Sequence, residues 1–418
     1  MGSVLTMAAR AEITAKYARE YVRAPKQVKG RLLDEVVAVT GWSRDNARRR
    51  LTAAAKPRPA GPARRRRGRK YSYDAVKVLQ KVWAASGFEC GKYLAAAMAD
   101  LVAALERHGE LVPGRGRYSP QVRDELHAMS AATIDRYLAP ARAKDQLRGR
   151  STTKPGQLLR NSIQVRKAGD EVEAEPGFFE GDTVAHCGPT LKGEFCRTLN
   201  LTDMRTGWTF TYSIRNNAHI HILAALDQAL AKIPFEVTGL DFDNGSEFIN
   251  HDVIGWAGDR KIFFTRCRPY KKNDQATIES KNNHLVRRYG FYWRYDTPEA
   301  LALLNRLWPL VNDRLNFYTP TKKPTGWDTD TQGRRRRRYD HPATPFDRLL
   351  AAGVLSPTQA TELRHYRDQL NPARLARDIQ SIQDRLTGLA KQATLDLQAA
   401  QLRPLPDTTA GIRLHKAS

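Results

Sequence analysis

The chain has 418 residues, and its 69 lysines and arginines exceed its 44 aspartates and glutamates by 69 − 44 = 25. This balance predicts binding to a polyanion, and a hydrophobic content of 41% disfavours disorder throughout. The cysteines, Cys90, Cys187, Cys196 and Cys267, form no CxxC pair, which argues against a disulfide framework or a zinc knuckle. No apolar run approaches the roughly 18 residues that span a bilayer, so we expect a soluble cytoplasmic or nucleoid-associated protein.

The N-terminal segment, residues 1–55, shows helical spacing of its apolar residues. Gly41 interrupts that spacing, and Ser43 can cap a further helix that bears Arg48, Arg49 and Arg50. A recognition helix needs basic and polar side chains to meet phosphates and base edges in the major groove. We therefore expect a helix-turn-helix DNA-binding module, with a plain three-helix bundle that has a solvated basic face as the alternative.

A basic, proline-rich stretch follows at 56–70, where the prolines oppose regular helix and the like charges repel each other. Its arginines Arg64, Arg65, Arg66 and Arg67 either contact a DNA backbone or belong to a solvated tether. Residues 71–143 return to helical periodicity and repeat the cap and helix order, with Arg136 exposed. We expect a second helical or helix-turn-helix DNA-binding module there, followed by a basic connector at 144–175.

Residues 176–320 have a different character, because β-branched and aromatic runs replace the helical pattern. The runs GFFEGDTVAH, EFCRTLNLTDM and WTFTYSIR come first, and the helical segment AHIHILAALDQALAKI follows them. FEVTGLDFD and KIFFTRC then supply two more strands with a helix between them. Three meandering strands, a helix, a strand, a helix and a strand predict a mixed sheet with helices on its faces.

Three acids that are distant in sequence can meet at one end of this sheet. Asp182 closes the first strand, Asp243 closes the fourth, and Glu279 lies in a segment with helical spacing. Alternation leaves Glu180 and Asp241 as competitors, but the later residue of each pair lies nearer the strand end. Mg²⁺ prefers carboxylate oxygens, and two ions about 3.5–4 Å apart can activate a nucleophile and stabilise the leaving oxygen in phosphodiester displacement.

These residues resemble the DDE integrase and transposase catalytic core of the retroviral-integrase superfamily. The resemblance rests on Asp182-Thr183, on DNGSEF at 243–248, on DQATIESKN at 274–282, and on the 279 − 243 − 1 = 35 residues between the last two acids. The flanks 268–274 and 295–318 are similar to prokaryotic insertion-sequence transposases. The resemblance implies an RNase H-like core in which Asp182, Asp243 and Glu279 are catalytic and hold two Mg²⁺ ions, with Mn²⁺ as a substitute.

The same resemblance implies a reaction: metal-dependent cleavage of transposon ends, then strand transfer of the freed 3′-OH into target DNA. The implied partners are double-stranded DNA, as terminal inverted repeats and target, and further copies of the chain on that DNA. Many relatives carry a basic residue seven positions after the glutamate, where this chain has Val286. The candidates for steadying the DNA end are Lys271, Lys272, Lys281, Arg287 and Arg288.

Two alternatives to a transposase remain at this stage. One is a non-catalytic sequence-specific DNA-binding protein, or an inactive transposase that acts as a repressor. The other is a stand-alone nuclease on an RNase H-like core, which would not need two helix-turn-helix modules and two basic arms.

The last quarter of the chain is expected to contain an Arg-rich linker at 321–340 and a helical region at 341–418. The linker's consecutive arginines either contact phosphates or form a solvated tether. An apolar stripe of Ile379, Ile382, Leu386 and Leu389 either dimerises or packs against its own chain.

The histidines are not expected to bind metal. We expect His219 and His221 to be packing or capping residues, and His186 and Cys187 to be loop residues beside the acids. The predicted protein is thus multidomain, with α-helical DNA-binding modules, an α/β RNase H-like core and a helical C-terminal region.

Overall fold

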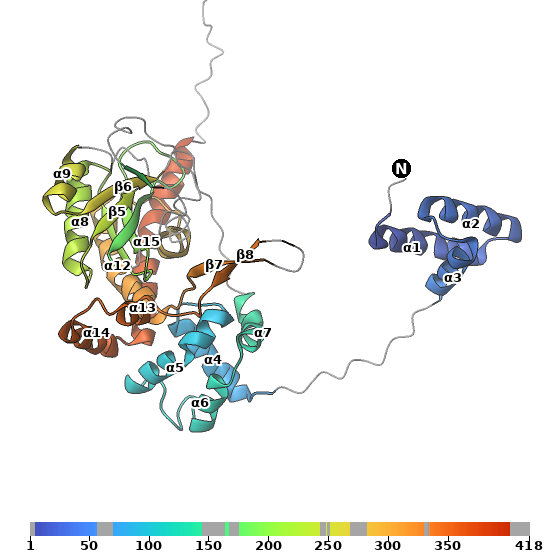
Figure 1. Ribbon diagram of the computed structural model, residues 1–418, viewed down its shortest axis with the longest axis horizontal. Coiled ribbons are helices and arrows are strands. Elements are labelled where there is room, and N and C mark those ends of the chain that lie inside the picture. Colours follow the sequence, from blue (N-terminus) through green and yellow to red (C-terminus); the bar gives the residue numbers. More distant parts are fainter. Residues whose placement is uncertain are drawn as a thin grey trace, which may run out of the picture. The chain divides into compact units, whose positions relative to one another are not determined.

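The computed structural model describes residues 5–56, 70–143, 164–166, 175–242, 248, 251–267, 282–329, 333 and 335–401 (Figure 1). The chain divides into two compact units, Met1–Lys70 and Tyr71–Ser418. Within the described residues, none of the helices combines the length and apolar character needed to cross a bilayer.

The N-terminal unit consists of α1 (Met7–Arg23), α2 (Lys26–Thr40) and α3 (Arg44–Ala55). Gly41 ends α2 in the left-handed conformation at φ 68°, and the Ser43 hydroxyl caps α3 by accepting from the backbone N–H of Asn46. Apolar side chains of all three helices, among them Ala18, Val36 and Leu51, form a small buried core. Helix, short turn and helix thus follow in the expected order, and DNA binding by this unit stays a prediction.

Four helices open the second unit: α4 (Tyr73–Ala85), α5 (Gly91–Arg107), α6 (Pro120–His127) and α7 (Ala131–Arg142). Their buried apolar cluster, which includes Leu79 and Leu101, continues into Trp208, Phe317 and Phe346 further along the chain. The second helical module is therefore packed onto the α/β part of the protein, and the two share one core.

A mixed sheet forms the centre of the second unit. Its six strands run in the order β1-β6-β5-β2-β3-β4, with bounds β1 (Gln164–Arg166), β2 (Phe178–Ala185), β3 (Arg197–Asp203), β4 (Thr209–Ile214), β5 (Gly239–Phe242) and β6 (Phe263–Cys267). β2, β3 and β4 form an antiparallel meander, whereas β5 and β6 run parallel to β2. This confirms the predicted mixed sheet. β1, which pairs with β6, lies in the range expected to be a connector.

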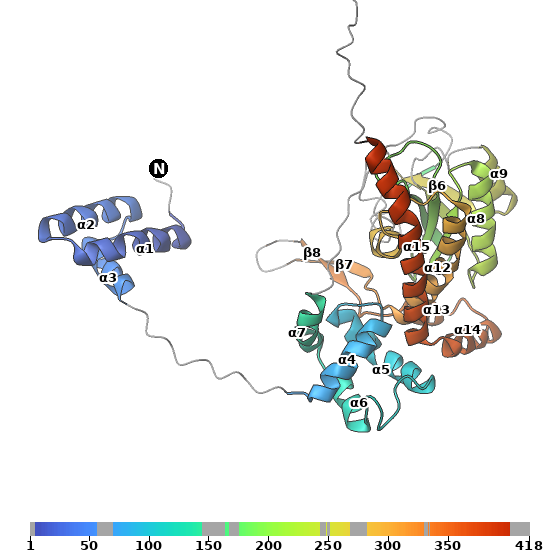
Figure 2. The same ribbon diagram turned by 180° about the vertical axis from the view of Figure 1, so that it is seen from behind.

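The two faces of the sheet differ in chemistry because side chains alternate along each strand. Phe179, Leu199, Leu201 and Phe242 belong to an apolar cluster with α8 (His219–Lys232) and α9 (His251–Asp259). The alternate positions of β3 and β4 are mostly threonine, serine and asparagine, and α12 (Pro298–Tyr318) hydrogen-bonds to this face. The sheet therefore lies between α8 and α9 on one side and α12 and α15 on the other (Figures 1 and 2).

The remaining elements are η2, a π-helical turn (Asn282–Arg287), α11 (Arg288–Gly290), β7 (Pro324–Thr329), β8 (Arg335–Tyr339), α13 (Pro345–Ala352), α14 (Pro357–Gln369) and α15 (Pro372–Gln401). The range 321–340 was expected to be a linker, and this expectation is wrong. β7 and β8 pair as an antiparallel hairpin, which sets PTGWDT opposite the arginine run.

The apolar stripe of α15 packs against its own chain. Ile379, Ile382 and Leu386 join one buried cluster with Leu304 and Trp308 of α12. Leu389, the fourth member of the predicted stripe, is 37% exposed. Of the two roles left open by the sequence, packing within the chain is the one that the structure supports for these three side chains.

Leu386→Ala should lower the free energy of unfolding by about 2–5 kcal/mol, because the change empties a fully buried site. Leu389→Ala is the matched control on the same helix and should cost clearly less. Urea denaturation followed by circular dichroism measures both. Equal, small losses in the two variants, together with a change in oligomeric mass for Leu386→Ala, would contradict packing within the chain.

Candidate active site

The first predicted acid, Asp182, lies on β2 where the pairing of β2 with β5 ends. The last pair of that ladder joins Gly181 to Phe242, and the Cα partner of Asp182 on the other side is Asn200 of β3. Asp243 follows Phe242 directly in the sequence, but Asp243 and Glu279 themselves lie outside the described residues. The structure thus describes the position of the first acid, of Phe242 directly before the second, and of Asn282 three residues after the third.

One asparagine orients the Asp182 carboxylate directly, and a second asparagine supports the first. Asn282 donates from Nδ2 to Asp182 Oδ2 at 2.5 Å, and the backbone N–H of Thr183 donates to Oδ1 at 2.7 Å. Asn200 in turn donates from Nδ2 to Asn282 Oδ1 at 3.2 Å. Asn282 is the first residue of η2 and follows Glu279 by three residues. Its hydrogen bonds therefore attach the start of η2 to β2 and β3 at Asp182.

Asn282 and Asn200 were missed by the sequence reasoning. Asn282 was visible as the last residue of DQATIESKN, at the i+3 position from the glutamate. Asn200 had no sequence signal, since only the β2–β3 register brings it opposite Asp182.

The competing acids lie deeper in the protein. Glu180 and Asp241 are Cα partners on neighbouring strands and are only 2% and 1% exposed. Thr265 of β6 donates its hydroxyl to Asp241 at 2.7 Å. Asp182, by contrast, is half-buried at the end of the ladder, where a substrate can reach it more readily. Asp182 is therefore more accessible to solvent than Glu180.

The basic candidates after η2 have different surroundings. Val286 is fully buried, whereas the Arg287 guanidinium lies 4.9 Å from the ring centre of Tyr292. Burial lowers the pKa of Arg287, and Tyr292, Cys187 and Asp182 act in the opposite direction. Arg288 donates to Glu89 Oε1 at 3.1 Å and to the carbonyl of Gly87. Arg288 therefore joins the α4–α5 loop to the segment that follows η2.

The other predicted DNA contacts are exposed where the structure describes them. Arg48 and Arg49 on α3 pair with Asp45 of the same helix, and Arg50 lies 4.5 Å from the ring centre of Trp42. Arg136 on α7 is exposed and donates to the Thr133 hydroxyl at 3.1 Å. The predicted contacts Arg64, Arg65, Arg66, Arg67, Lys271, Lys272 and Lys281 lie outside the described residues.

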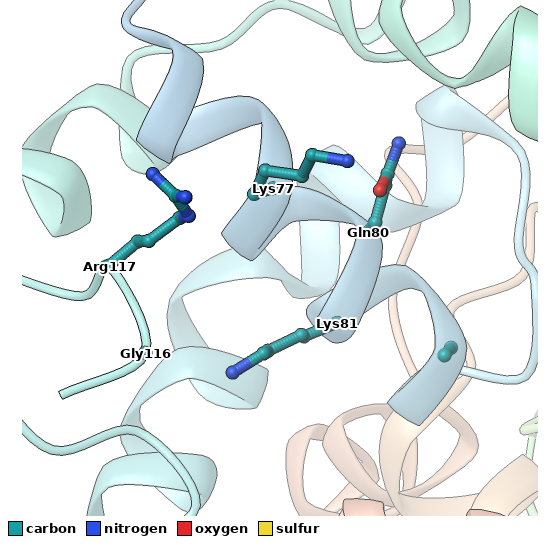
Figure 3. A pocket seen from close by; sticks show the side chains of 6 residues that line it. Lys77, Gln80, Lys81, Gly116 and Arg117 are labelled. Carbon is teal, nitrogen blue, oxygen red and sulfur yellow. The ribbon is translucent and has the colours of Figure 1, made fainter.

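A basic surface cavity of about 520 Å³ lies on the second helical module (Figure 3). Lys77, Gln80 and Lys81 of α4 line it together with Gly116 and Arg117 from the α5–α6 loop. Arg117 also donates to Asp74 at 2.8 Å. The sequence reasoning missed this cluster, although Lys77 and Lys81 are one helical turn apart.

His186 lies directly after β2, outside the helices and strands as expected for a loop residue, and its side chain is fully buried. Its Nε2 lies 2.7 Å from Thr198 Oγ1, Thr198 contacts Ser213 Oγ at 2.7 Å, and Trp308 Nε1 donates to Ser213 Oγ at 2.7 Å. Loss of solvation lowers the pKa of His186 to about 3, and the nearby Arg287 acts in the same direction. This polar chain attaches the end of β2 to α12.

His219 takes neither of its two expected roles. Its side chain is exposed, and its Nε2 lies 3.2 Å from Asp252 of α9. The cap position of α8 belongs to Ala218, which makes no side-chain cap bond.

The family model described as the integrase core domain matches residues 173–272 of the chain. The chain belongs to the DDE integrase and transposase superfamily. Its central sheet, with three antiparallel strands continued by parallel β5 and β6 and with helices on both faces, is accordingly an RNase H-like integrase core. Proteins with this core have a transposase or integrase type of function.

Two further comparisons place the chain among known proteins. The uncharacterized protein y4rM of Sinorhizobium fredii (strain NBRC 101917 / NGR234) is 36% identical over 348 residues, which cover 83% of this chain and 97% of that relative. The solved catalytic core domain of BIV integrase is 15% identical and aligns with 46% of this chain and 98% of its own, at a TM-score of 0.29. That structural likeness is weak.

The protein's buried histidine should make its stability depend on pH. His186 has a folded pKa of about 3, against about 6.5 when unfolded. Above pH 6.5 the histidine is neutral in both states. As the pH falls below about 6.5, only the unfolded chain takes up the proton, so about 2 kcal/mol of stability should be lost by about pH 5.

Urea denaturation at about pH 7 and about pH 5 measures this loss. His186→Gln should remove the histidine's share of the difference, whereas the exposed control His219→Gln should leave it unchanged. An identical pH dependence in wild type and His186→Gln would contradict the neutral, buried histidine.

Proposed function

We propose that this member of the superfamily is an insertion-sequence transposase, a polynucleotidyl transferase that cleaves transposon DNA ends and joins the freed 3′-OH to target DNA. The observation that supports it most is the setting of Asp182. The immediate neighbour of Asp243, Phe242, pairs beside it, and Asn282, three residues after Glu279, donates to its carboxylate. Phe242, which precedes Asp243, and Asn282, which follows Glu279 by three residues, therefore both lie beside this part of β2.

The donor set fits a hard divalent cation. Carboxylate oxygens are the ligands that Mg²⁺ and Mn²⁺ prefer, and the three proposed ligands are Asp182, Asp243 and Glu279. The described part of the chain has no cluster of three metal-ligating side chains, and it contains one of these three acids. When bound, the ions would help to activate the attacking hydroxyl and to stabilise the leaving oxygen.

The chain's own residues would hold the acid and the DNA in place. The Asn282 amide fixes one oxygen of Asp182, which limits the rotation of a carboxylate that must receive a cation in one geometry. Arg287 lies near Asp182 and supplies positive charge at the same end of the sheet. Lys271, Lys272 and Lys281 are proposed contacts to the phosphates of the DNA end.

DNA recognition is proposed for the helical parts of the chain. The exposed Arg48, Arg49 and Arg50 project from α3, which follows a short turn as a recognition helix does. Arg136 has the equivalent place on α7. Arg64, Arg65, Arg66 and Arg67 would add backbone contacts, and the protein would act as an oligomer that holds DNA ends together in the prokaryotic nucleoid.

Each of the variants Asp182→Asn, Asp243→Asn and Glu279→Gln should reduce nicking and joining by at least about a hundredfold. Each substitution removes a carboxylate charge at the reacting phosphate while leaving the DNA-binding surfaces intact, so binding to the ends should persist. The assay is a labelled duplex with the ends of the DNA that flanks the gene, incubated with Mg²⁺ or Mn²⁺.

Asp259→Asn, at an exposed acid of α9, is the control and should cleave normally. Binding without cleavage by the wild type itself would support the non-catalytic, repressor-like alternative. Cleavage by the wild type and by all three acid variants would contradict the assigned roles.

Asn282→Ala should lower cleavage by about 10- to 100-fold and raise the metal concentration needed for half-maximal rate, because loss of an orienting partner weakens metal binding. DNA binding without metal should not change. Asn283→Ala, at the exposed neighbouring residue, is the matched control. A fall in rate with no change in metal requirement would argue that Asn282 only stabilises the fold.

A further inference from the structure

The β7–β8 hairpin is an exposed ribbon with a concentrated charge. Trp327 pairs with Arg337, Asp328 with Arg336, and Gly326 with Arg338. All residues of β7 are exposed, as are residues 336–339 of β8. The ribbon stands apart from the central sheet in both views (Figures 1 and 2).

The two faces of the ribbon carry different side chains. Residues opposite each other share a face, and so do alternate residues along a strand. Trp327, Arg337 and Tyr339 therefore lie on one face, whereas Arg336 and Arg338 lie on the other with Asp328. Trp327 is 54% exposed and Tyr339 is 50% exposed, and the Arg337 guanidinium lies 5.3 Å from the centre of the tryptophan ring.

The base of the hairpin is firmly anchored to the rest of its unit. Lys323 and Asp340, which flank the strands, exchange two hydrogen bonds, and Lys323 Nζ donates to the Met204 carbonyl at 2.9 Å. Arg348 of α13 donates to Asp340 Oδ2 at 2.8 Å and to the Thr321 carbonyl at 2.7 Å. The base of the hairpin is thus held in place before any ligand binds, which reduces the conformational entropy lost on binding.

An isolated two-stranded ribbon is only marginally stable in water. Guanidinium groups and an aromatic ring on one narrow arm are the combination that binds nucleic acid whose bases are accessible: arginines meet phosphates and the ring stacks on a base. Bases inside a duplex are already stacked on each other, so the aromatic face would need unpaired nucleotides, as at a DNA end or junction.

We propose that the β7–β8 hairpin is a DNA-binding arm that contacts phosphates through Arg336 and Arg338 and stacks an unpaired base on Trp327. The choice of DNA rests on the proposed function, whose reaction exposes unpaired nucleotides where strands are cut and joined. The arm would thereby favour a DNA end with an unpaired extension over a blunt duplex.

The experiment uses the full chain in EDTA, so that no cleavage occurs. Fluorescence anisotropy measures its binding to a short blunt duplex and to the same duplex with a few unpaired nucleotides at the 3′ end. Wild type should bind the extended probe at least about fivefold more tightly, the lower range for one base stacked on an aromatic ring. Trp327→Ala should abolish this preference without changing binding to the blunt probe, whereas Trp327→Phe should keep it.

The arginines have a separate readout. The double variant Arg336→Ala with Arg338→Ala should weaken binding to both probes and reduce the slope of log affinity against log salt by about 2, since each phosphate contact contributes about 0.9. The matched control removes two exposed arginines elsewhere, Arg364→Ala with Arg374→Ala on α14 and α15. Circular dichroism confirms that each variant is folded.

Three results would overturn the arm: no preference for the extended probe in wild type, an unchanged preference in Trp327→Ala, or tighter binding to an RNA of the same sequence. These results are independent of cleavage, so they separate the arm from the active site. If the chain does not cleave DNA but Trp327→Ala loses the preference for the extended probe, the role of the hairpin is supported and the proposed function is not. If the chain cleaves DNA but Trp327→Ala keeps that preference, only the role of the hairpin is contradicted.

Discussion

The alternation of apolar and polar side chains across the central strands is the constraint on which the rest of the structure depends. One face of the sheet carries Leu199, Leu201 and Phe242 and is covered by α8 and α9. The opposite face buries hydroxyl, amide and carboxyl groups, and each such group needs a partner because an unpaired buried polar group costs free energy. Trp308 and Asn305 of α12 donate to Ser213 and so hold the helix on this face. Asp182 stands on the polar face, where Asn282 donates to its carboxylate and Asn200 donates to Asn282.

The π-helical turn η2 connects Asp182 to the second helical module. Asn282 at its start touches Asp182, and Arg288, just beyond its end, forms an ion pair with Glu89 in the α4–α5 loop. The side chains of this pair are 33% and 10% exposed, so the pair is shielded and its loss would leave a charge in a partly buried place. The helices at 71–143 therefore help to hold η2 beside Asp182.

Much of the core could be predicted because its signals are local. Period-two alternation and β-branched residues indicated β2 to β6, and an Asn-Gly turn indicated where β5 ends. The errors share another cause. The arginine run was assigned to a linker because its charge is visible along the chain, whereas its pairing with Pro324–Thr329 is a contact between separate strands. The burial of His186 was not predicted, because it depends on Tyr295 and Trp308, which lie more than a hundred residues away.

The sequence by itself determined the chemistry available to this protein: the net charge, the three acids with their spacing, and the order of helices and strands from β2 to β6. These are properties of composition and of short-range periodicity. Only the tertiary structure decided which groups meet: that Asn282 holds Asp182, that Glu89 pairs with Arg288, and that α15 buries its stripe against α12. Such contacts join distant residues through strand register and helix packing, and no local pattern in the chain encodes them.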